Sequence, residues 1–212
     1  GKPVREHMFP DLRGTLNKVH FVFNIDKDGD KRRSIEDWIT SVTNILGRDI
    51  DNSKDFEVRL QAKWDGCSAV FECDENGIVE HVLMRGDTEK NQAVDIIELF
   101  RDNIDFKEFA NGRQKFAIQT EVLMNQEDYE KICIEYKEFK SPRSATSSIL
   151  NEKILQPHLA KYLTVEPLRI QYVGTKPAII PNENYDMISN LFDLRDIQEC
   201  IKQINENVKL DG

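Results

Sequence analysis

Residues 63–66, Lys-Trp-Asp-Gly, place an amine nucleophile two positions before a carboxylate and three before a glycine. A lysine attacks a phosphorus centre only as the free amine, a form that burial or nearby cations favour. In an extended segment Lys63 and Asp65 point to the same side, and Gly66 lets the chain turn away closely. Taken alone, the four residues favour a simpler interpretation, a surface lysine and aspartate at the start of a hairpin.

The segments around this motif predict antiparallel β structure. The runs 67–73 and 78–84 flank Asp74-Glu75-Asn76-Gly77, and Asn-Gly between alternating apolar runs is a strong hairpin signal. Strands are also expected from residue 56 onward, over 115–124 and over 165–173. In the strand 115–124, Glu121 points to one side, and the other side carries Phe116, Ile118, Thr120 and Val122. Lys63 is therefore expected where a set of antiparallel strands begins.

Helical spacing of apolar residues appears between these strands. Asn125 is expected to cap a helix over 126–139, and Pro142 to begin another with a serine-rich first turn. Further helices are predicted from Ser34 to Gly47, around Val94–Ile104, and as a pair over 182–192 and 194–204. Residues 208–212 resemble the start of a strand. Strands and helices together predict an α+β fold.

The amino-acid composition favours some classes of protein and argues against others. The chain has 212 residues, 39% of them hydrophobic and 32% charged, which fits a soluble protein of one large domain or of one and a half domains. No apolar run approaches the roughly 20 residues of a membrane span. The four cysteines lack Cys-x-x-Cys spacing, which favours free thiols in a reducing compartment such as the cytoplasm. A net charge of −9 argues against a free-standing nucleic-acid binder, although DNA contacts can lie on another segment or chain.

An acidic stretch begins at Asp26 and resembles a calcium-binding loop. Counted from Asp26, Lys31 stands where that loop needs glycine, and Arg33 stands at its hydrophobic position. The final position holds Asp37 rather than glutamate. An acidic surface turn is therefore the preferred interpretation.

Four motifs follow one another along the chain, and their order resembles a known family. They are Lys63-Trp64-Asp65-Gly66, Arg85-Gly86-Asp87, Thr120-Glu121-Val122-Leu123-Met124 and Ser141-Pro142-Arg143-Ser144-Ala145. In this order and spacing they resemble the adenylation domain of NAD-dependent DNA ligases. The resemblance covers nearly all of residues 1–212. It implies a nucleotidyltransferase core, similar to ATP-grasp folds, in which antiparallel sheets and flanking helices surround a nucleotide cleft.

The resemblance also implies roles for individual residues. Lys63 would be the nucleophile that forms lysyl-AMP from NAD, and Asp65 would position the lysine or its metal. Mg²⁺ would be held by Glu121 and Asp211. The substrate would be nicked double-stranded DNA. The residues expected to bind the nucleotide cofactor are Thr15, Leu16, Gln61, Lys63, Arg85, Glu121 and Arg143.

Several positions depart from the family pattern. Gln61, Thr88 and Asn151 stand where the family usually carries glutamate, glycine and arginine. The family's N-terminal domain for nicotinamide mononucleotide and its C-terminal OB-fold, zinc and DNA-binding modules are expected outside this sequence. A second ligase polypeptide is the expected partner that supplies them. Two alternatives stay open: a catalytically idle subunit with the same fold, and an ATP-dependent nucleic-acid ligase or capping enzyme that shares the lysine motif.

Overall fold

A computed structural model describes residues 2–13, 40–41, 44–45, 57–86, 89–101, 103–183, 186–190 and 194–207. The chain divides into two compact units. The first contains the described residues within 1–14, 61–186 and 204–212, and the second those within 15–60 and 187–203. Lys63, Glu121 and Arg143 therefore all belong to the first unit.

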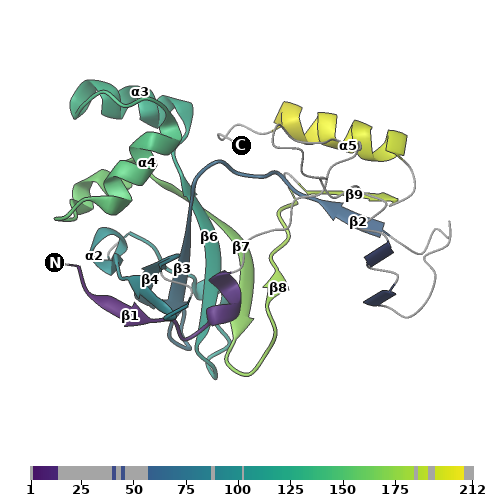
Figure 1. Ribbon diagram of the computed structural model, residues 1–212, viewed down its shortest axis with the longest axis horizontal. Helices are drawn as coiled ribbons and strands as arrows, with labels where there is room; N and C mark the ends of the chain where they lie inside the picture. The colour runs from purple at the N-terminus through teal and green to yellow at the C-terminus, as the bar shows by residue number, and fades with distance from the viewer. Residues whose placement is uncertain are drawn as a thin grey trace. The chain divides into compact units, whose positions relative to one another are not determined.

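The first unit is built on a five-stranded antiparallel sheet with the strand order β4-β3-β6-β7-β8 (Figure 1). Its strands are β3 (Cys67–Cys73), β4 (Val79–Met84), β6 (Phe116–Leu123), β7 (Thr164–Tyr172) and β8 (Ala178–Ile179). The predicted hairpin between β3 and β4 is confirmed. Asp74 Oδ1 accepts hydrogen bonds from the backbone N–H groups of Asn76 and Ile78, which closes the turn. The strands predicted over 115–124 and 165–173 are likewise confirmed as β6 and β7.

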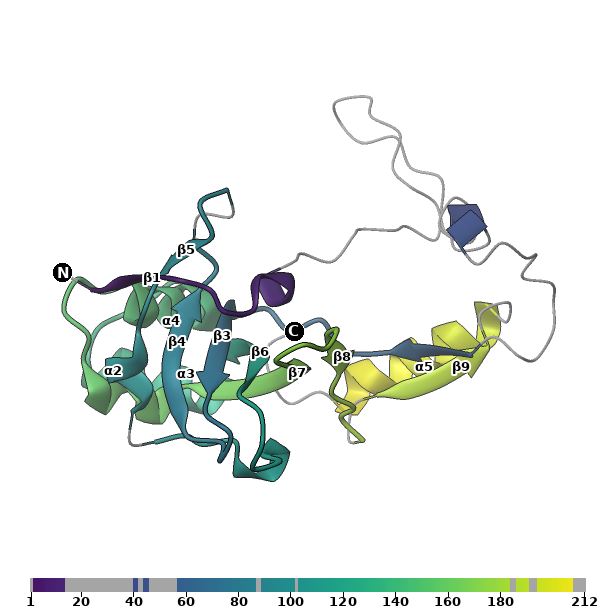
Figure 2. The same ribbon diagram turned by 90° about the horizontal axis from the view of Figure 1, so that it is seen from below.

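The two faces of this sheet are covered differently. One face carries the main hydrophobic core, in which Phe71, Phe116 and Val122 are fully buried beneath helices (Figures 1 and 2). The helical segments are α2 (Ile97–Phe100), η2 (Lys107–Phe109), α3 (Gln126–Glu135), α4 (Pro142–Asn151) and η3 (Pro157–Tyr162). On the other face, η1 (Pro10–Arg13) places Leu12 in a smaller cluster with Val70 and Ala117. Glu121 lies outside both clusters, as the predicted alternation along β6 requires.

Local signals account for the starts of α3 and α4. Asn125 Oδ1 accepts a hydrogen bond from the backbone N–H of Asp128, which confirms the predicted cap of α3. Ser141 and Ser144 bond each other's backbone in a capping box, and Pro142 occupies the first turn of α4. The backbone of α4 is therefore fixed at its first turn, where Arg143 stands.

The helix predicted around Val94–Ile104 is wrong in part. Residues Gln92–Val94 form strand β5, which pairs with β1 (Val4–Glu6), and only the single turn α2 follows. The apolar spacing suits a helix, but the N-terminal segment supplies a strand partner that the local pattern does not reveal.

The second unit contains β2 (Glu57–Leu60) paired antiparallel with β9 (Met187–Asn190), with the part of α5 (Leu194–Asn207) up to Gln203 alongside (Figures 1 and 2). The predicted helix over 194–204 is confirmed by α5. The predicted helix over 182–192 is wrong, because Met187–Asn190 pairs with a strand some 130 positions earlier in the chain. Residues 40–41 and 44–45, the described part of the helix predicted from Ser34, are helical. The acidic stretch 26–30 and the strand predicted at 208–212 lie outside the described residues.

Two predictions from composition can be compared with the structure. All four cysteines are free of disulfide bonds, as predicted; Cys73 and Cys200 are buried, and Cys67 and Cys133 are half-buried. None of the helices in the described ranges is long and apolar enough to cross a membrane.

Candidate active site

The loop 61–66 leads into β3 and is anchored by its tryptophan. Trp64 is only 7% exposed. It lines a small hollow together with Pro167 and Leu168 of β7 and Ile180. Lys63 is exposed and Asp65 half-buried on either side of this anchor. A bulky apolar side chain between the two polar ones therefore fixes the loop to the sheet, while both functional groups keep access to solvent.

Gly66 allows the loop to pass directly over β6. Its backbone N–H donates a 3.2 Å hydrogen bond to Glu121 Oε1. A Cβ atom at this position would lie 2.3 Å from the carbonyl oxygen of Val122 and 3.0 Å from Glu121 Cγ. Such contacts are too short for any side chain, so the approach of the loop to Glu121 requires glycine.

Glu121 holds a central place in the cluster. It stands opposite Ser68 of β3 in the sheet register and is half-buried. Burial raises the pKa of its carboxyl group, and the Gly66 N–H, Lys63 and Arg143 oppose that rise. Asp65 raises the pKa further. Glu121 therefore feels the charges of Lys63, Asp65 and Arg143 together, which places all four side chains in one electrostatic neighbourhood.

Arg143 reaches this neighbourhood from the first turn of α4. Its Nη1 donates a hydrogen bond to Asp65 Oδ1. Both side chains are substantially open to solvent, with 58% of Arg143 and 44% of Asp65 exposed. An ion pair this exposed contributes about 0–1 kcal/mol to stability. The pair therefore brings the two motifs together without being needed to hold the fold.

Arg85 lies at the end of β4, the strand next to β3, and it does not contact the cluster. It follows Met84, the residue of β4 that pairs with Ala69 of β3. Ser68, one position before Ala69, pairs with Glu121 on the other side. Arg85 and Glu121 thus lie about two strand spacings apart, roughly 10 Å. Among the described residues Arg85 makes no hydrogen bond or ion pair, so its guanidinium is available to a ligand.

Gln61 is held in a second group of polar residues. Its Nε2 donates a 3.0 Å hydrogen bond to Asp186 Oδ2, which also accepts from the backbone N–H of Asn182. Asn182 Nδ2 in turn donates to Glu166 Oε1, at 2.5 Å. The structure thus connects Gln61 to the segment after β8 and does not bring it to Glu121 or Arg143.

Cys67 and Ser147 belong to the cluster, although the sequence motifs did not single them out. Burial and the nearby Glu121 raise the pKa of the Cys67 thiol, while Arg143 and a hydrogen bond with Ser147 lower it. Ser147 lies four positions after Arg143 on α4, so both residues share one helical face. Helical spacing could have suggested Ser147, and adjacency to Gly66 could have suggested Cys67.

Three predicted site residues, Thr15, Leu16 and Asp211, lie outside the described residues. Within the described ranges, no group of three or more histidine, cysteine, aspartate or glutamate side chains is arranged to hold a metal ion. Asp65 and Glu121 are the two carboxylates at the cluster. A site of this kind suits Mg²⁺ only together with ligand phosphates, because Mg²⁺ commonly uses one or two carboxylates, waters and substrate oxygens.

No model of a known protein family matches this chain, and a search of curated proteins gives no match. The functional interpretation therefore depends on the residues and their geometry.

Proposed function

We propose that this chain is the adenylation component of an NAD-dependent DNA ligase. Lys63 attacks the α-phosphorus of NAD, the bond from that phosphorus to nicotinamide mononucleotide breaks, and a lysyl-AMP phosphoramidate forms. The AMP then passes to the 5′-phosphate at a nick in double-stranded DNA, and attack by the neighbouring 3′-hydroxyl releases AMP and seals the strand. NAD and Mg²⁺ are the proposed cofactors, and a second ligase polypeptide is the proposed partner.

The observation that carries the proposal is that the loop of Lys63 meets two other segments of the chain, through the hydrogen bonds from Gly66 to Glu121 and from Arg143 to Asp65. The loop thus carries an exposed amine, and a fixed carboxylate and a guanidinium contact the same loop. A guanidinium stabilises the negative charge that develops on a phosphate during attack. A carboxylate that is already fixed by the Gly66 N–H is suited to accept hydrogen bonds from a ribose. These are the groups that nucleotide transfer to a lysine needs.

The ion pair between Asp65 and Arg143 fits this proposal as a resting arrangement. A nucleotide phosphate offers Arg143 a stronger, bidentate partner than a solvent-exposed carboxylate does. When Arg143 turns to the phosphate, Asp65 is released beside Lys63, where it can orient the amine or contribute an oxygen to Mg²⁺. Glu121 would be the second described carboxylate near that ion, and Asp211 is proposed as a further ligand. The nucleotidyltransferase fold is proposed on the same basis as the activity.

The test is the mass of the intact protein after incubation with Mg²⁺ and either NAD or ATP. We expect one adenylyl group to be added from NAD, and none in Lys63→Ala. Lys115→Ala is the matched control, because Lys115 forms an exposed ion pair with Glu80 at the far end of β6. That variant should be modified like the unaltered chain.

A second measurement covers the case in which the partner polypeptide is required for turnover. Calorimetric titration with AMP should show binding that Glu121→Ala weakens by about tenfold, the loss expected for one hydrogen bond to a charged group. A chain that neither acquires the adduct nor binds AMP contradicts the proposal. An adduct from ATP but not from NAD would assign the chain to the ATP-dependent ligases or capping enzymes. Binding of AMP without any adduct, even with a partner polypeptide, would indicate a catalytically idle subunit.

A further inference from the structure

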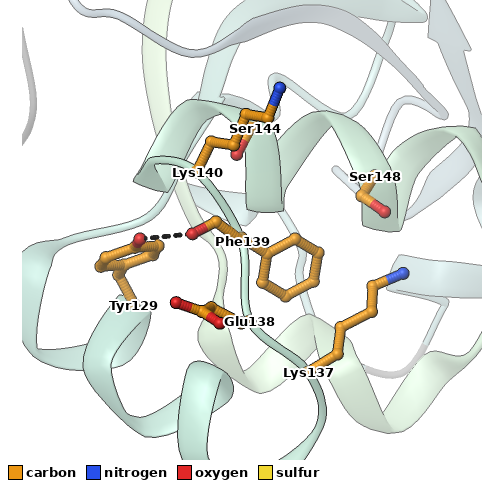
Figure 3. Close-up of a pocket in the computed structure, with 7 residues that line it drawn as sticks. All are labelled: Tyr129, Lys137, Glu138, Phe139, Lys140, Ser144 and Ser148. Carbon is orange, nitrogen blue, oxygen red and sulfur yellow. Dashed lines mark hydrogen bonds between the residues drawn. The ribbon is translucent and has the colours of Figure 1, made fainter.

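A hollow of about 800 Å³ lies beside α3 and α4 in the first unit. The segment that joins the two helices forms one wall, and the first turns of α4 form another. Figure 3 shows the ring of Phe139 near its centre, with Lys137 and Ser148 on one side of the ring in this view and Lys140 and Ser144 on another. The hollow is far larger than a single inorganic anion requires.

The side chains around the hollow offer two lysines and hydrogen-bond donors, together with one carboxylate, that of Glu138. Lys140 and Ser148 have no hydrogen-bond or ion-pair partner among the described residues. Lys137 Nζ lies 5.1 Å from the centre of the Phe139 ring, and its nearest carboxylate oxygen, Glu152 Oε1, is 3.9 Å away. Ser144 is already used in the capping box. The groups available to a ligand are therefore two ammonium groups and one hydroxyl.

The two aromatic side chains of the hollow are held in place. Tyr129 Oη donates a 2.8 Å hydrogen bond to the carbonyl oxygen of Phe139, a contact drawn in Figure 3. The Phe139 ring stacks on Tyr136, with 6.5 Å between the ring centres. Fixed aromatic faces between cationic side chains are typical of surfaces that bind nucleic-acid strands, because bases and sugars pack on the rings while lysines contact phosphates.

The hollow and the candidate active site both use the first turn of α4. Ser144 lines the hollow, and its neighbour Arg143 contacts Asp65. Lys137, Lys140 and Arg143 follow one another at intervals of three residues, in a chain whose net charge is −9. The two lysines that line the hollow outnumber its one carboxylate, Glu138, so this surface is more positive than the acidic chain as a whole, which favours an anionic polymer as its ligand.

We propose that the hollow beside α3 and α4 binds the phosphodiester backbone of the nucleic-acid strand that is presented to Lys63. Lys140 and Lys137 contact successive phosphates, and Phe139 packs against the sugar or base between them. The inference rests on the proposed ligase function and assigns its polymeric substrate to a particular surface.

The test compares Lys140→Glu with Lys115→Glu in the full chain. Both substitutions change the net charge equally, and Lys140 is exposed and makes no hydrogen bond or ion pair within the described residues, so both variants should fold. Binding of a fluorescent nicked duplex is followed by anisotropy at several salt concentrations, without NAD. Lys140→Glu should weaken binding by roughly tenfold and reduce the slope of log K against log salt by about 1. Lys115→Glu should leave both values close to those of the unaltered chain.

The same two variants are also tested for lysyl-AMP formation, which separates this inference from the proposed function. Lys140→Glu should acquire the adduct from NAD at the normal rate, because the hollow contacts the strand and not the dinucleotide. Equal DNA affinity in the two variants overturns the inference, as does an unaltered chain that shows no binding at low salt. Slower adduct formation with unchanged DNA affinity also overturns it and assigns the hollow to the dinucleotide. A missing adduct in all three proteins, together with no binding of AMP, refutes the ligase function while leaving the DNA comparison readable.

Discussion

Two pairs of arginine and aspartate in the first unit have the same chemistry and different surroundings. Asp95 has a fully buried side chain that accepts hydrogen bonds from Arg5 Nε and from the backbone N–H groups of Val82 and Ile97. His81 Nδ1 lies 2.8 Å from the same carboxylate. Asp65, by contrast, is 44% exposed, and its partner Arg143 is more exposed still.

This difference in exposure distinguishes an arginine–aspartate pair with a structural role from one that is suited to a functional role. The Asp95 carboxylate joins β1, β4 and α2 and is itself fully buried, although the side chain of Arg5 is 49% exposed, so the buried carboxylate depends on its hydrogen-bond donors. Asp65 joins a loop to a helix at the surface, where either partner can exchange the other for a ligand at little cost. Burial, and not the identity of the residues, distinguishes the pair that holds the fold from the pair that can act.

The largest effect expected is on stability, from Asp95→Ala. The substitution leaves the N–H groups of Val82 and Ile97 buried without acceptors, and each such group costs about 1–3 kcal/mol. We expect a loss of at least about 3 kcal/mol in the free energy of unfolding, measured by urea denaturation. A loss below about 1 kcal/mol would contradict the structural role assigned to Asp95.

The second prediction concerns pH and the same buried region. His7 is 4% exposed, and burial, followed by the charge of Arg13, lowers its pKa from 6.5 to about 4. The folded state therefore binds fewer protons than the unfolded state between these values, and stability falls as pH falls from 6.5 towards 4. His7→Phe should lessen that fall by about 2 kcal/mol, measured as the difference between the two denaturation series.

Comparing the unaltered chain with His7→Phe separates the effect of His7 on the pH dependence of stability from the effect of its neighbour Glu72. Burial raises the pKa of Glu72, so its titration changes stability in the opposite direction, and both proteins retain it. Parallel pH profiles for the two proteins would show that His7 is not kept neutral by burial.

The third prediction tests the close approach of the loop 61–66 to β6. Gly66→Ala brings a methyl group against the carbonyl oxygen of Val122, so the loop must move. We expect a loss of about 1–2 kcal/mol in stability and the loss of lysyl-AMP formation. Gly112→Ala is the control, because Gly112 has a φ of +66° and open space around it. This control substitution should lower the free energy of unfolding by about 1 kcal/mol and leave lysyl-AMP formation unchanged. Normal adduct formation in Gly66→Ala would contradict the role given to this approach.

The smallest effect on stability is expected from Asp65→Ala. The lost ion pair is exposed at both ends, so the free energy of unfolding should change by less than about 1 kcal/mol. Lysyl-AMP formation should nevertheless be strongly reduced in the same protein. A large loss of stability would show that this pair is structural after all, and the contrast with Asp95 would disappear.

The elements that could be predicted are those with strong local signals. Asp74–Gly77 closes its turn by local hydrogen bonds, and Asn125 caps α3 within four residues. The strands β5 and β9 could not be recognised, because their pairing partners, β1 and β2, lie far away in the sequence. Whether a short apolar segment forms a strand depends on the segment with which it pairs.

For the candidate site, the sequence by itself determined which residue types are present and which local elements carry them. From the sequence, Gly66 could be placed on a loop, Glu121 on a strand and Arg143 at the start of a helix. Only the tertiary structure decided that Gly66 donates to Glu121, 55 positions away, and that Arg143 bonds Asp65 across 78 positions. It also decided that Gln61 contacts Asp186 instead. Sheet register and helix packing set these contacts, because they fix which side chains meet and how much water reaches them.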